Sequence, residues 1–561
     1  MNKTVVRLLF LGISLLVLSA AQAQTVYKYW VEFTDKEGSP YRLERPDEFL
    51  GPRALERRAR QGIAVDNLDL PVNPGYLEAL RQEGCRVQNR SRWLNGAVAF
   101  VDSGDMADPS ILPFADRVGA LPFVRSVVLC DSGSVFQPDT DFANIGGWLP
   151  DFEVDTLFGQ AYYGWGYRQI AQLRGQSLHR AGFEGQGMII GVCDCGFPGV
   201  NTIPLVEPMR REGRLLATRD FVWSEEDDVF SVHAHGTHCF ALMAADAPGR
   251  YVGTAPKASY VLCRTENVMD ENVLEEYNWV AAAEWLDSLG ADIVTTSLGY
   301  FNYDDTTRSY TLDDLDGFTA PMSRAAGVAV SRGMLVLNSA GNDGRAFPQH
   351  LNVPADAPAV LSVGAVDSTG ERATFSAHGP TATGCIKPDV MALGEQVVTA
   401  TPDGYYSTGN GTSLACPVMA GMMACLWQMF PNLTPRQLCD SVRAWGSFSS
   451  IPSQLCGYGI PDFSRALLSQ PVGIAQAGVD EGGVSLFPNP APKGAKVEVS
   501  CDVTPAWVEV YDVMGRKLFH SRTEGQTTHV RLPVLPSGVY VVRVAAAEGS
   551  CRLLKLIIGG E

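Results

Sequence analysis

The sequence lacks a surplus of positive charge. Its 561 residues include 44 Lys and Arg against 62 Asp and Glu, which gives a formal net charge of −18 and a pI near 4.9. Proteins that bind nucleic acid draw much of their affinity from clustered cations that displace counterions from phosphates. Here the cations are spread along the chain, so the composition argues against a nucleic-acid partner and assigns the acidic excess to solubility.

Long apolar runs are also missing beyond the N-terminus. A membrane-spanning helix needs about 20 consecutive apolar residues, and no later stretch reaches that length without charges or breakers. The N-terminus has Lys3 and Arg7 before an apolar run at 8–18, and the small-x-small sequence Ala-Gln-Ala at 21–23 follows. This pattern predicts a signal peptide at 1–23, hence export without a transmembrane segment; a hydrophobic N-terminal helix of a cytosolic protein is the alternative.

The 13 cysteines do not form a disulfide framework that the sequence alone defines. The odd number leaves at least one thiol free if all the others bridge. Cys193 and Cys195 share one face of a predicted strand and are poorly placed to bond to each other. The disulfides that we expect are Cys439 with Cys456 and Cys501 with Cys551.

The length predicts three to four domains at about 150 residues each, and 46% hydrophobic residues suffice for real cores. Residues 24–130 carry strand and helix patterns that predict a small α+β module. Its basic helix at 53–60 is expected to present a solvated face. Residues 131–154 are rich in Gly, Pro and Asp and are typical of a linker.

Residues 155–470 alternate short apolar runs with helical patterns. Strands this apolar, separated by helices, predict an α/β domain in which helices cover both faces of a parallel sheet. The expected strands are 188–193, 259–263, 292–296, 334–338 and 360–366, and the expected helices are 238–245, 273–289 and 321–332. After a linker at 471–483, two-residue alternation within 484–561 predicts a small all-β sandwich.

Three polar side chains stand where such a domain holds its ligands, at the carboxyl ends of strands and the starts of helices. Asp194 ends an apolar strand, His235 lies at the start of a predicted helix, and Ser413 precedes the apolar run 418–430. Taken singly, Asp194 is typical of a turn and Ser413 of a helix cap. Together they fit an orienting carboxylate, a general base and a nucleophile.

Asn342 adds a fourth group just past the strand at 334–338. Its amide can donate a hydrogen bond to a developing oxyanion, with the backbone N–H of Ser413 as second donor. A different chemistry stays open, because His233, His235 and His238 have a spacing that zinc hydrolases use. That zinc hypothesis leaves Asp194, Asn342 and Ser413 without a role.

At these residues the sequence resembles the subtilisin-like serine proteases, the subtilases. The segments that carry the resemblance stand in family order: Asp194–Gly196, His235–His238, Ser297–Gly299, Ser339–Asn342 and Gly411–Pro417. The resemblance implies a secreted serine endopeptidase of subtilisin-like fold that acts on polypeptides through Asp194, His235 and Ser413. It makes Asn342 the oxyanion donor. The residues that it implies for substrate binding are Ser297, Leu298, Gly299, Ala340 and Gly341.

The flanking modules have resemblances of their own. Residues 24–130 are similar in element order to subtilase propeptides, which implies a zymogen processed between residues 128 and 155. Residues 484–561 resemble the C-terminal sorting domain of type IX secretion, on the motifs 486–490, 510–515, 535–540 and 553–558. This resemblance implies delivery by outer-membrane machinery to the surface or exterior of a Gram-negative member of the Bacteroidota; a substrate-binding sandwich is the alternative.

The sequence departs from the family beside the catalytic motifs. Cys195 and Cys416 replace more usual small residues, and Cys239-Phe240 follows His238 where Val-Ala is common. No cofactor is expected for catalysis. Structural calcium is possible at an unknown site, although the acidic clusters 225–228 and 313–316 lack the spacing of a known calcium loop. A non-catalytic surface protein on the same fold is a further alternative.

Overall fold

The computed structural model describes residues 26–102, 113–131, 142–144, 159–223 and 228–469, with parts of 484–558. The predicted signal peptide at 1–23 and the linker at 471–483 lie outside the described residues. The chain divides into two compact units, Met1–Phe463 and Ser464–Glu561, which we describe separately.

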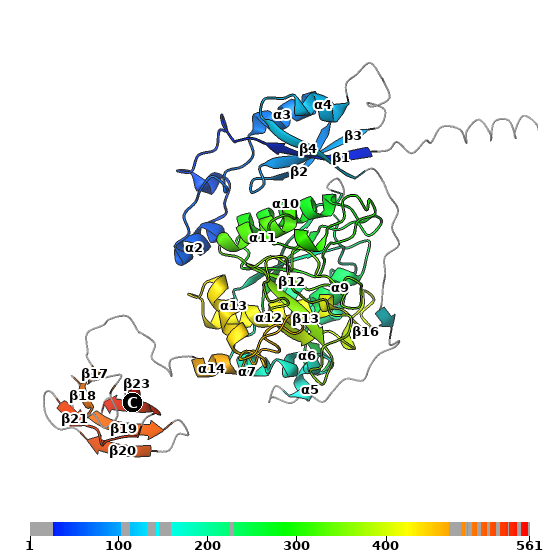
Figure 1. Cartoon of the computed structure of the whole chain (residues 1–561). Coiled ribbons are helices and arrows are strands. Elements are labelled where there is room, and N and C mark those ends of the chain that lie inside the picture. Colours follow the sequence, from blue (N-terminus) through cyan, green and yellow to red (C-terminus); the bar gives the residue numbers. More distant parts are fainter. Residues whose placement is uncertain are drawn as a thin grey trace, which may run out of the picture. The chain divides into compact units, whose positions relative to one another are not determined.

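The first unit begins with a small α+β module (Figure 1). Its four antiparallel strands are ordered β2-β3-β1-β4, and buried side chains such as Phe33, Leu80 and Phe114 join the sheet to the helices. The elements are β1 (Val26–Phe33), η1 (Pro46–Glu48), α2 (Pro52–Gln61), α3 (Pro74–Gln82), β2 (Arg86–Ser91), β3 (Gly96–Asp102), α4 (Phe114–Gly119) and β4 (Val124–Asp131). The α+β prediction is confirmed.

A seven-stranded parallel sheet forms the centre of the larger domain, in the order β14-β13-β12-β11-β6-β10-β7. The central strands are buried throughout, which explains why they are continuously apolar. Their bounds are β6 (Ile189–Asp194), β7 (Leu215–Asp220), β10 (Ser259–Arg264), β11 (Ile293–Thr296), β12 (Leu335–Ser339), β13 (Leu361–Val366) and β14 (Val390–Leu393).

Helices pack against both faces of this sheet, as the sequence predicts. Helices α9 and α12 contact each other and the sheet on one side, and α10 and α11 pair on the other (Figure 1). The helices are α5 (Gln160–Tyr163), α6 (Tyr167–Gln172), α7 (Gln176–Arg180), η3 (Pro204–Val206), α8 (Glu207–Arg211), α9 (His235–Ala244), α10 (Leu274–Leu289), η4 (Leu312–Asp314), α11 (Pro321–Ser331), α12 (Thr412–Met429) and α13 (Pro435–Ala444).

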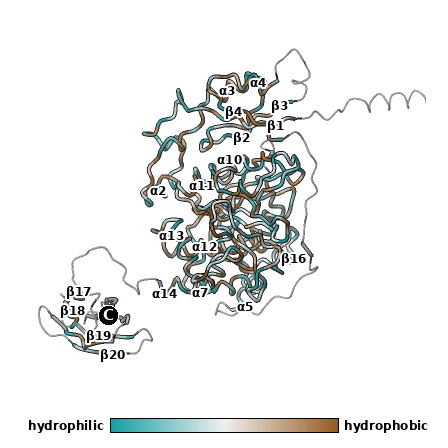
Figure 2. The backbone as a smooth tube through the Cα atoms, in the orientation of Figure 1, coloured by the Kyte–Doolittle hydropathy of each residue, from teal (hydrophilic) through white to brown (hydrophobic). Residues whose placement is uncertain are grey.

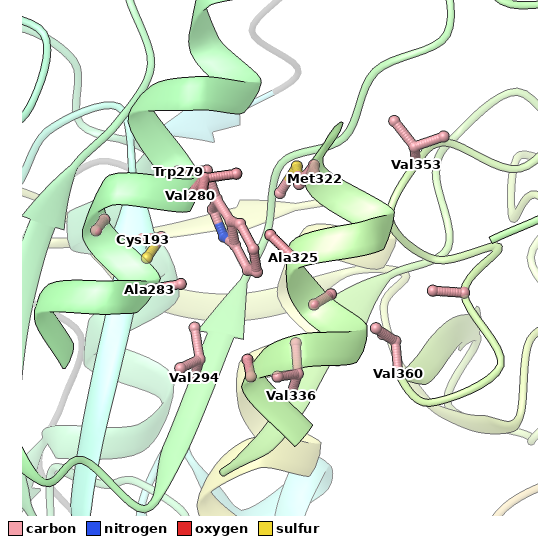
Figure 3. Packing of buried hydrophobic residues seen from close by; sticks show 14 of the residues in the cluster. Cys193, Trp279, Val280, Ala283, Val294, Met322, Ala325, Val336, Val353 and Val360 are labelled. Carbon is pink, nitrogen blue, oxygen red and sulfur yellow. The ribbon is translucent and has the colours of Figure 1, made fainter. Parts of the chain in front are cut away.

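The core between the sheet and the pair α10 and α11 is built around Trp279. Figure 3 shows its indole between α10 and α11, above Val294 of β11 and Val336 of β12. The indole Nε1 donates to Thr296 Oγ1 at 2.8 Å, so the buried ring leaves no polar atom unsatisfied. Figure 2 shows the apolar segments of the larger domain gathered in its interior and the polar segments along its outer loops.

Helix α12 is the most apolar helix of this domain. Among the described residues it alone is long and apolar enough to cross a membrane, but 94% of it is buried inside the domain. It contacts α9 and strands β11 to β14. Its composition therefore reflects its position as a core helix.

The segment predicted as a linker, 131–154, contributes a short strand. Strand β5 (Phe142–Asn144) pairs with β16 (Tyr406–Gly409), which pairs with β15 (Val397–Ala400). A two-stranded sheet of β8 (Asp246–Ala247) and β9 (Tyr251–Val252) completes the secondary structure of this unit. The rest of the linker is described only at residue 131.

The basic run of α2 is not a solvated face, so that prediction is wrong. Arg57 and Arg58 are each 1% exposed, and both donate to the fully buried carboxylate of Asp287 on α10. Arg92 donates to the same carboxylate at 2.6 Å. Burial alone raises the pKa of Asp287, but the hydrogen bonds and charges of these arginines outweigh it and hold the pKa below its usual value. The N-terminal module is thus joined to α10 by paired, buried charges.

The expected disulfide between Cys439 and Cys456 is also wrong. Both thiols are free, and Cys439 is buried in α13. The other expected pair, Cys501 with Cys551, lies outside the described side chains. A free thiol packed in a helix behaves as a small apolar residue.

The second unit begins with the short helix α14 (Arg465–Ser469). Its described residues within 484–561 form only strands and loops, as predicted. Its two antiparallel sheets have the orders β17-β18-β21 and β20-β19-β22-β23, and Val499, Val510 and Leu556 are among the side chains of its core. The strands are β17 (Val484–Phe487), β18 (Glu498–Cys501), β19 (Ala506–Asp512), β20 (Lys517–Arg522), β21 (Thr528–Arg531), β22 (Gly538–Ala546) and β23 (Cys551–Ile558).

The Asp287 cluster makes a stability prediction. We expect Asp287→Ala to lower the free energy of unfolding of the full chain by about 3–5 kcal/mol, because three buried guanidinium groups lose their shared acceptor. Glu78→Ala is the matched control, since its pair with Arg81 is exposed and is worth less than about 1 kcal/mol. Urea unfolding of both variants makes the comparison, and equal losses would contradict a stabilising role for the cluster.

Candidate active site

The strand order brings several polar side chains to one edge of the sheet. Asp194 ends β6, Glu266 lies two residues past β10, Ser297 follows β11, and Asn342 lies three residues past β12. Because β12, β11, β6 and β10 are parallel neighbours, their carboxyl ends meet at the same edge. Residues 72 positions apart or more in sequence, such as Asp194 and Glu266, therefore become neighbours.

Asp194 and His235 form a hydrogen-bonded pair at this edge. His235 is the first residue of α9, and its Nδ1 lies 2.7 Å from Oδ1 of Asp194. The side chain of Asp194 is fully buried and that of His235 is 17% exposed. A carboxylate can only accept, so Nδ1 is the donor, and in the neutral ring Nε2 then carries the lone pair. This is the tautomer that a general base requires.

The two groups shift each other's pKa in opposite directions. Burial acts to raise the pKa of Asp194, but the charge and hydrogen bond of His235 hold it below its usual value. Burial acts to lower the pKa of His235, but the charge of Asp194 outweighs it and raises that pKa well above 6.5. The imidazolium that forms when His235 takes up a proton is therefore stabilised at this site.

Ser413 lies at the start of α12 and is held there by its own backbone. Ser413 is the second residue of the helix and is 9% exposed. Its carbonyl oxygen accepts from Ser297 Oγ at 2.8 Å and from Cys239 Sγ at 3.3 Å. Since Cys239 Sγ also lies 3.9 Å from His235 Nε2, the two helix starts meet at this thiol.

Asn342 presents its amide group beside Ser413 in the cleft. Its Oδ1 accepts from both the backbone N and the Oγ1 of Thr412, each at 3.0 Å, so that the oxygen is fixed and the amide nitrogen remains to donate. A Cβ on Gly411 would lie 2.7 Å from Ser413 Oγ and 3.7 Å from Asn342 Nδ2. Glycine at 411 therefore keeps open the space between the hydroxyl and the amide.

These side chains line one cleft of about 290 Å³. The cleft is lined by the predicted residues His235, Ser297, Leu298, Gly299, Gly341, Asn342 and Ser413. Asp194 lies buried behind His235. Ala340 does not line the cleft, because it is fully buried and its N–H donates to Val363 O at 2.9 Å.

Three acidic residues of this cleft are missing from the sequence-based set, namely Glu266, Glu271 and Asp343. Glu266 and Glu271 belong to the segment that follows β10, and Asp343 follows β12. The signal that could have found them is the one that found Asp194, namely a carboxylate just past an apolar strand of a parallel sheet.

The histidines of the zinc hypothesis do not gather into a ligand set. His238 Nδ1 is bonded to Ala400 O at 2.8 Å, and His233 Nδ1 lies 3.4 Å from Cys195 Sγ. Within the described part of the chain, the group of potential metal ligands that does gather is Asp194, His235 and Cys239. The arrangement thus gives no geometric support to a three-histidine zinc site.

The thiols beside these residues are held in their protonated form. Burial raises the pKa of Cys416 to about 12 and, together with the charge of Asp194, raises that of Cys195 further.

The carboxylates of the acidic cluster at 313–316 accept hydrogen bonds from their own loop, since Asp314 accepts from Thr311 and Asp316 accepts from Thr319. Most of the cluster at 225–228 lies outside the described residues.

Comparison with known families gives one match for each of the three modules. Residues 185–459 match the model of the subtilase family. Residues 28–133 match the peptidase S8 propeptide domain of Bacteroidota, and residues 485–559 match a secretion system C-terminal sorting domain.

Individual relatives match the middle of the chain. Subtilisin E of Bacillus subtilis is 29% identical over 283 residues, which are 50% of this chain and 65% of that protein. A subtilisin of Bacillus pumilus is 28% identical over 283 residues and is matched over 90% of its length. The serine protease AprX of Bacillus subtilis is 29% identical, with 46% of this chain and 61% of that protein covered. The chain thus spans less than two thirds of the length of subtilisin E and of AprX.

The pair Asp194 and His235 makes a prediction that titration can check. We expect Asp194→Asn to lower the pKa of His235, because burial would then act without the carboxylate that opposes it. Nitrogen-15 NMR of the imidazole rings measures this directly. His179 is the internal control, since burial alone lowers its pKa to about 4 and the substitution should leave it there. An unchanged His235 titration would contradict the pairing.

Proposed function

We propose that this chain, which carries a subtilase-family domain at residues 185–459, is an exported serine endopeptidase. One observation supports this most. His235, which is hydrogen-bonded to Asp194, lines the same cleft as Ser413 at the start of α12. The relatives that match this domain are subtilisins. Their activity is the activity that we assign to this chain.

In the proposed reaction, His235 Nε2 takes the proton of Ser413 Oγ as that oxygen attacks a peptide carbonyl. The carbonyl oxygen becomes an oxyanion, which accepts hydrogen bonds from Asn342 Nδ2 and the backbone N–H of Ser413. Asp194 stabilises the imidazolium, in keeping with the raised pKa of His235.

The intermediate then collapses as the carbon–nitrogen bond breaks. His235 gives its proton to the leaving amine, and an ester between the substrate and Ser413 remains. A water molecule attacks this ester while His235 accepts its proton, and the carboxylic acid product leaves as Ser413 recovers its hydrogen. No step needs a cofactor; structural calcium stays a possibility without an assigned site.

The N-terminal module is proposed to act as the propeptide of a zymogen. It contacts α10 through the buried ions of Arg57, Arg58 and Arg92 and through Trp30, whose ring stacks on Tyr277 at 4.1 Å. A module held by such contacts would stay attached after one peptide bond is cut, so processing between 128 and 155 need not release it at once.

The C-terminal module is proposed to carry the chain to the outer-membrane secretion machinery. Its match to a sorting domain supports type IX export, and the propeptide match to Bacteroidota agrees with that route. The expected location is the cell surface or the exterior, where polypeptide substrates are met. The signal peptide at 1–23 would start this route.

Labelling with a fluorophosphonate tests the nucleophile. We expect the full chain to be labelled covalently as Ser413 Oγ displaces fluoride from phosphorus, and we expect Ser413→Ala to lose this label. Ser339→Ala is the matched control, because Ser339 lines the same cleft and is not the proposed nucleophile. Labelling that persists in Ser413→Ala would sink the assignment.

Asn342→Ala tests the oxyanion donor. Removal of the oxyanion-hole asparagine of subtilisin lowers turnover by about 10² to 10³, and we expect a similar loss of kcat here with little change in KM. Asn410→Ala is the control, since Asn410 is exposed and its side chain accepts from Gln396 N. The kcat and KM of peptide hydrolysis are measured for both variants. Equal kcat values would contradict the role of Asn342 as an oxyanion donor.

A further inference from the structure

The cleft beside Ser413 is acidic. Three carboxylates line it, those of Glu266, Glu271 and Asp343, and no Lys or Arg is among its lining residues. Glu266 and Glu271 are partly exposed and lie on the segment between β10 and α10. A cleft that accepts an extended polypeptide here would present negative charge to its side chains.

The two glutamates form no ion pair within the described part of the chain. Glu266 accepts from Tyr300 Oη at 3.5 Å. Burial and the charge of Asp194 raise the pKa of Glu266 to about 7, although the charge of His235 opposes this rise. Burial and the neighbouring carboxylates of Glu266, Asp304 and Asp270 raise that of Glu271.

Buried carboxylates elsewhere in the same domain are held by cations or by several hydrogen-bond donors. Asp389 is 2.8 Å from Lys387 Nζ and 2.7 Å from an Arg443 nitrogen, and Glu276 accepts from two tyrosine hydroxyls and a backbone N–H. A carboxylate largely withdrawn from water with neither kind of partner is costly unless a ligand supplies one. The contrast therefore points to a cationic ligand for the cleft.

The N-terminal module already brings a lysine toward the outer end of this acidic segment. Lys28 Nζ lies 2.5 Å from Asp131 Oδ2. Burial and Asp131 raise the pKa of Asp270 to about 6, and the charge of Lys28 opposes that rise. The charge of Lys28 thus acts on Asp270, although the two residues are far apart in sequence.

The sheet order sets where a substrate would meet the glutamates. Strands β10 and β11 flank β6, so the segment with Glu266 and Glu271 and the segment Ser297–Gly299 emerge on opposite sides of Asp194. A polypeptide extended along Ser297–Gly299 would lie between the two. Its side chains could reach the glutamates close to the reacting carbonyl.

We infer that the cleft selects polypeptides with a Lys or Arg on the acyl side of the cut bond, and that Glu266 and Glu271 bind this cation. The inference rests on the proposed function. A bound divalent ion fits less well, since neither glutamate belongs to the group of potential metal ligands in the described residues. A guanidinium instead offers donors in a fork that suits a carboxylate.

Matched peptides test the selectivity of the full, processed chain. Each pair of quenched peptides carries Arg or its neutral isostere citrulline at one of four positions on the acyl side, and a chelator is present throughout. We expect kcat/KM to favour Arg by about tenfold or more at one position, because hydrogen bonds between charged groups are strong. The preference should grow as the pH rises through about 7, because only ionised Glu266 attracts the cation.

Variants separate charge recognition from folding. In Glu266→Gln with Glu271→Gln the Arg preference should vanish, so that the ratio of kcat/KM for the Arg peptide to kcat/KM for its citrulline partner falls to about one. Glu371→Gln, an exposed carboxylate away from the cleft, should keep the full preference. If the double variant does not fold, the preference of the unmodified chain and its pH dependence still decide.

Two negative results are distinct. A chain that reacts with fluorophosphonate and cleaves both peptides of every pair equally overturns the selectivity alone. A preference that persists in the double variant overturns the assignment to the glutamates. A chain that neither labels nor cleaves any peptide overturns the proposed function, and the selectivity with it.

Discussion

The parallel order of β12, β11, β6 and β10 is the constraint on which the candidate site depends. Because these neighbours run in one direction, each delivers the residue after its carboxyl end to the same edge. Helices α9 and α12 begin at that edge, and this brings His235 and Ser413 to Asp194 and Asn342. Antiparallel pairing of any one strand would send its polar terminus to the opposite edge.

The partners of the buried and half-buried carboxylates distinguish those with a structural role from those that we propose bind substrate. Asp287 is surrounded by three arginines and Asp194 by His235, so these carboxylates stay ionised although they are buried. Glu266 and Glu271 form no ion pair in the described part of the chain, although the charge of His235 acts on Glu266. For Asp287 and Asp194 the protein itself offsets the cost of removing a charge from water. For the two glutamates a cationic substrate would offset it.

Much of the fold could be predicted from the sequence, because apolar runs and helical periodicity are local signals. The predicted strands at 259–263 and 360–366 differ from β10 and β13 by one residue at one end. The basic helix was misjudged because an arginine that faces water and one that faces Asp287 look alike in sequence. The pairing of Cys439 with Cys456 failed for a similar reason, since number and spacing do not reveal where a thiol packs.

The sequence by itself determined the modules, the run of strands and helices, and the chain order of Asp194, His235 and Ser413, since each depends on residues close together along the chain. Only the tertiary structure decided that Gly341 lines the cleft and Ala340 does not, that Cys239 lies between two helix starts, and that two glutamates face the same space as Ser413. The physical reason is that burial, distance and electrostatic field arise between segments far apart in sequence, and only the packed sheet brings those segments together.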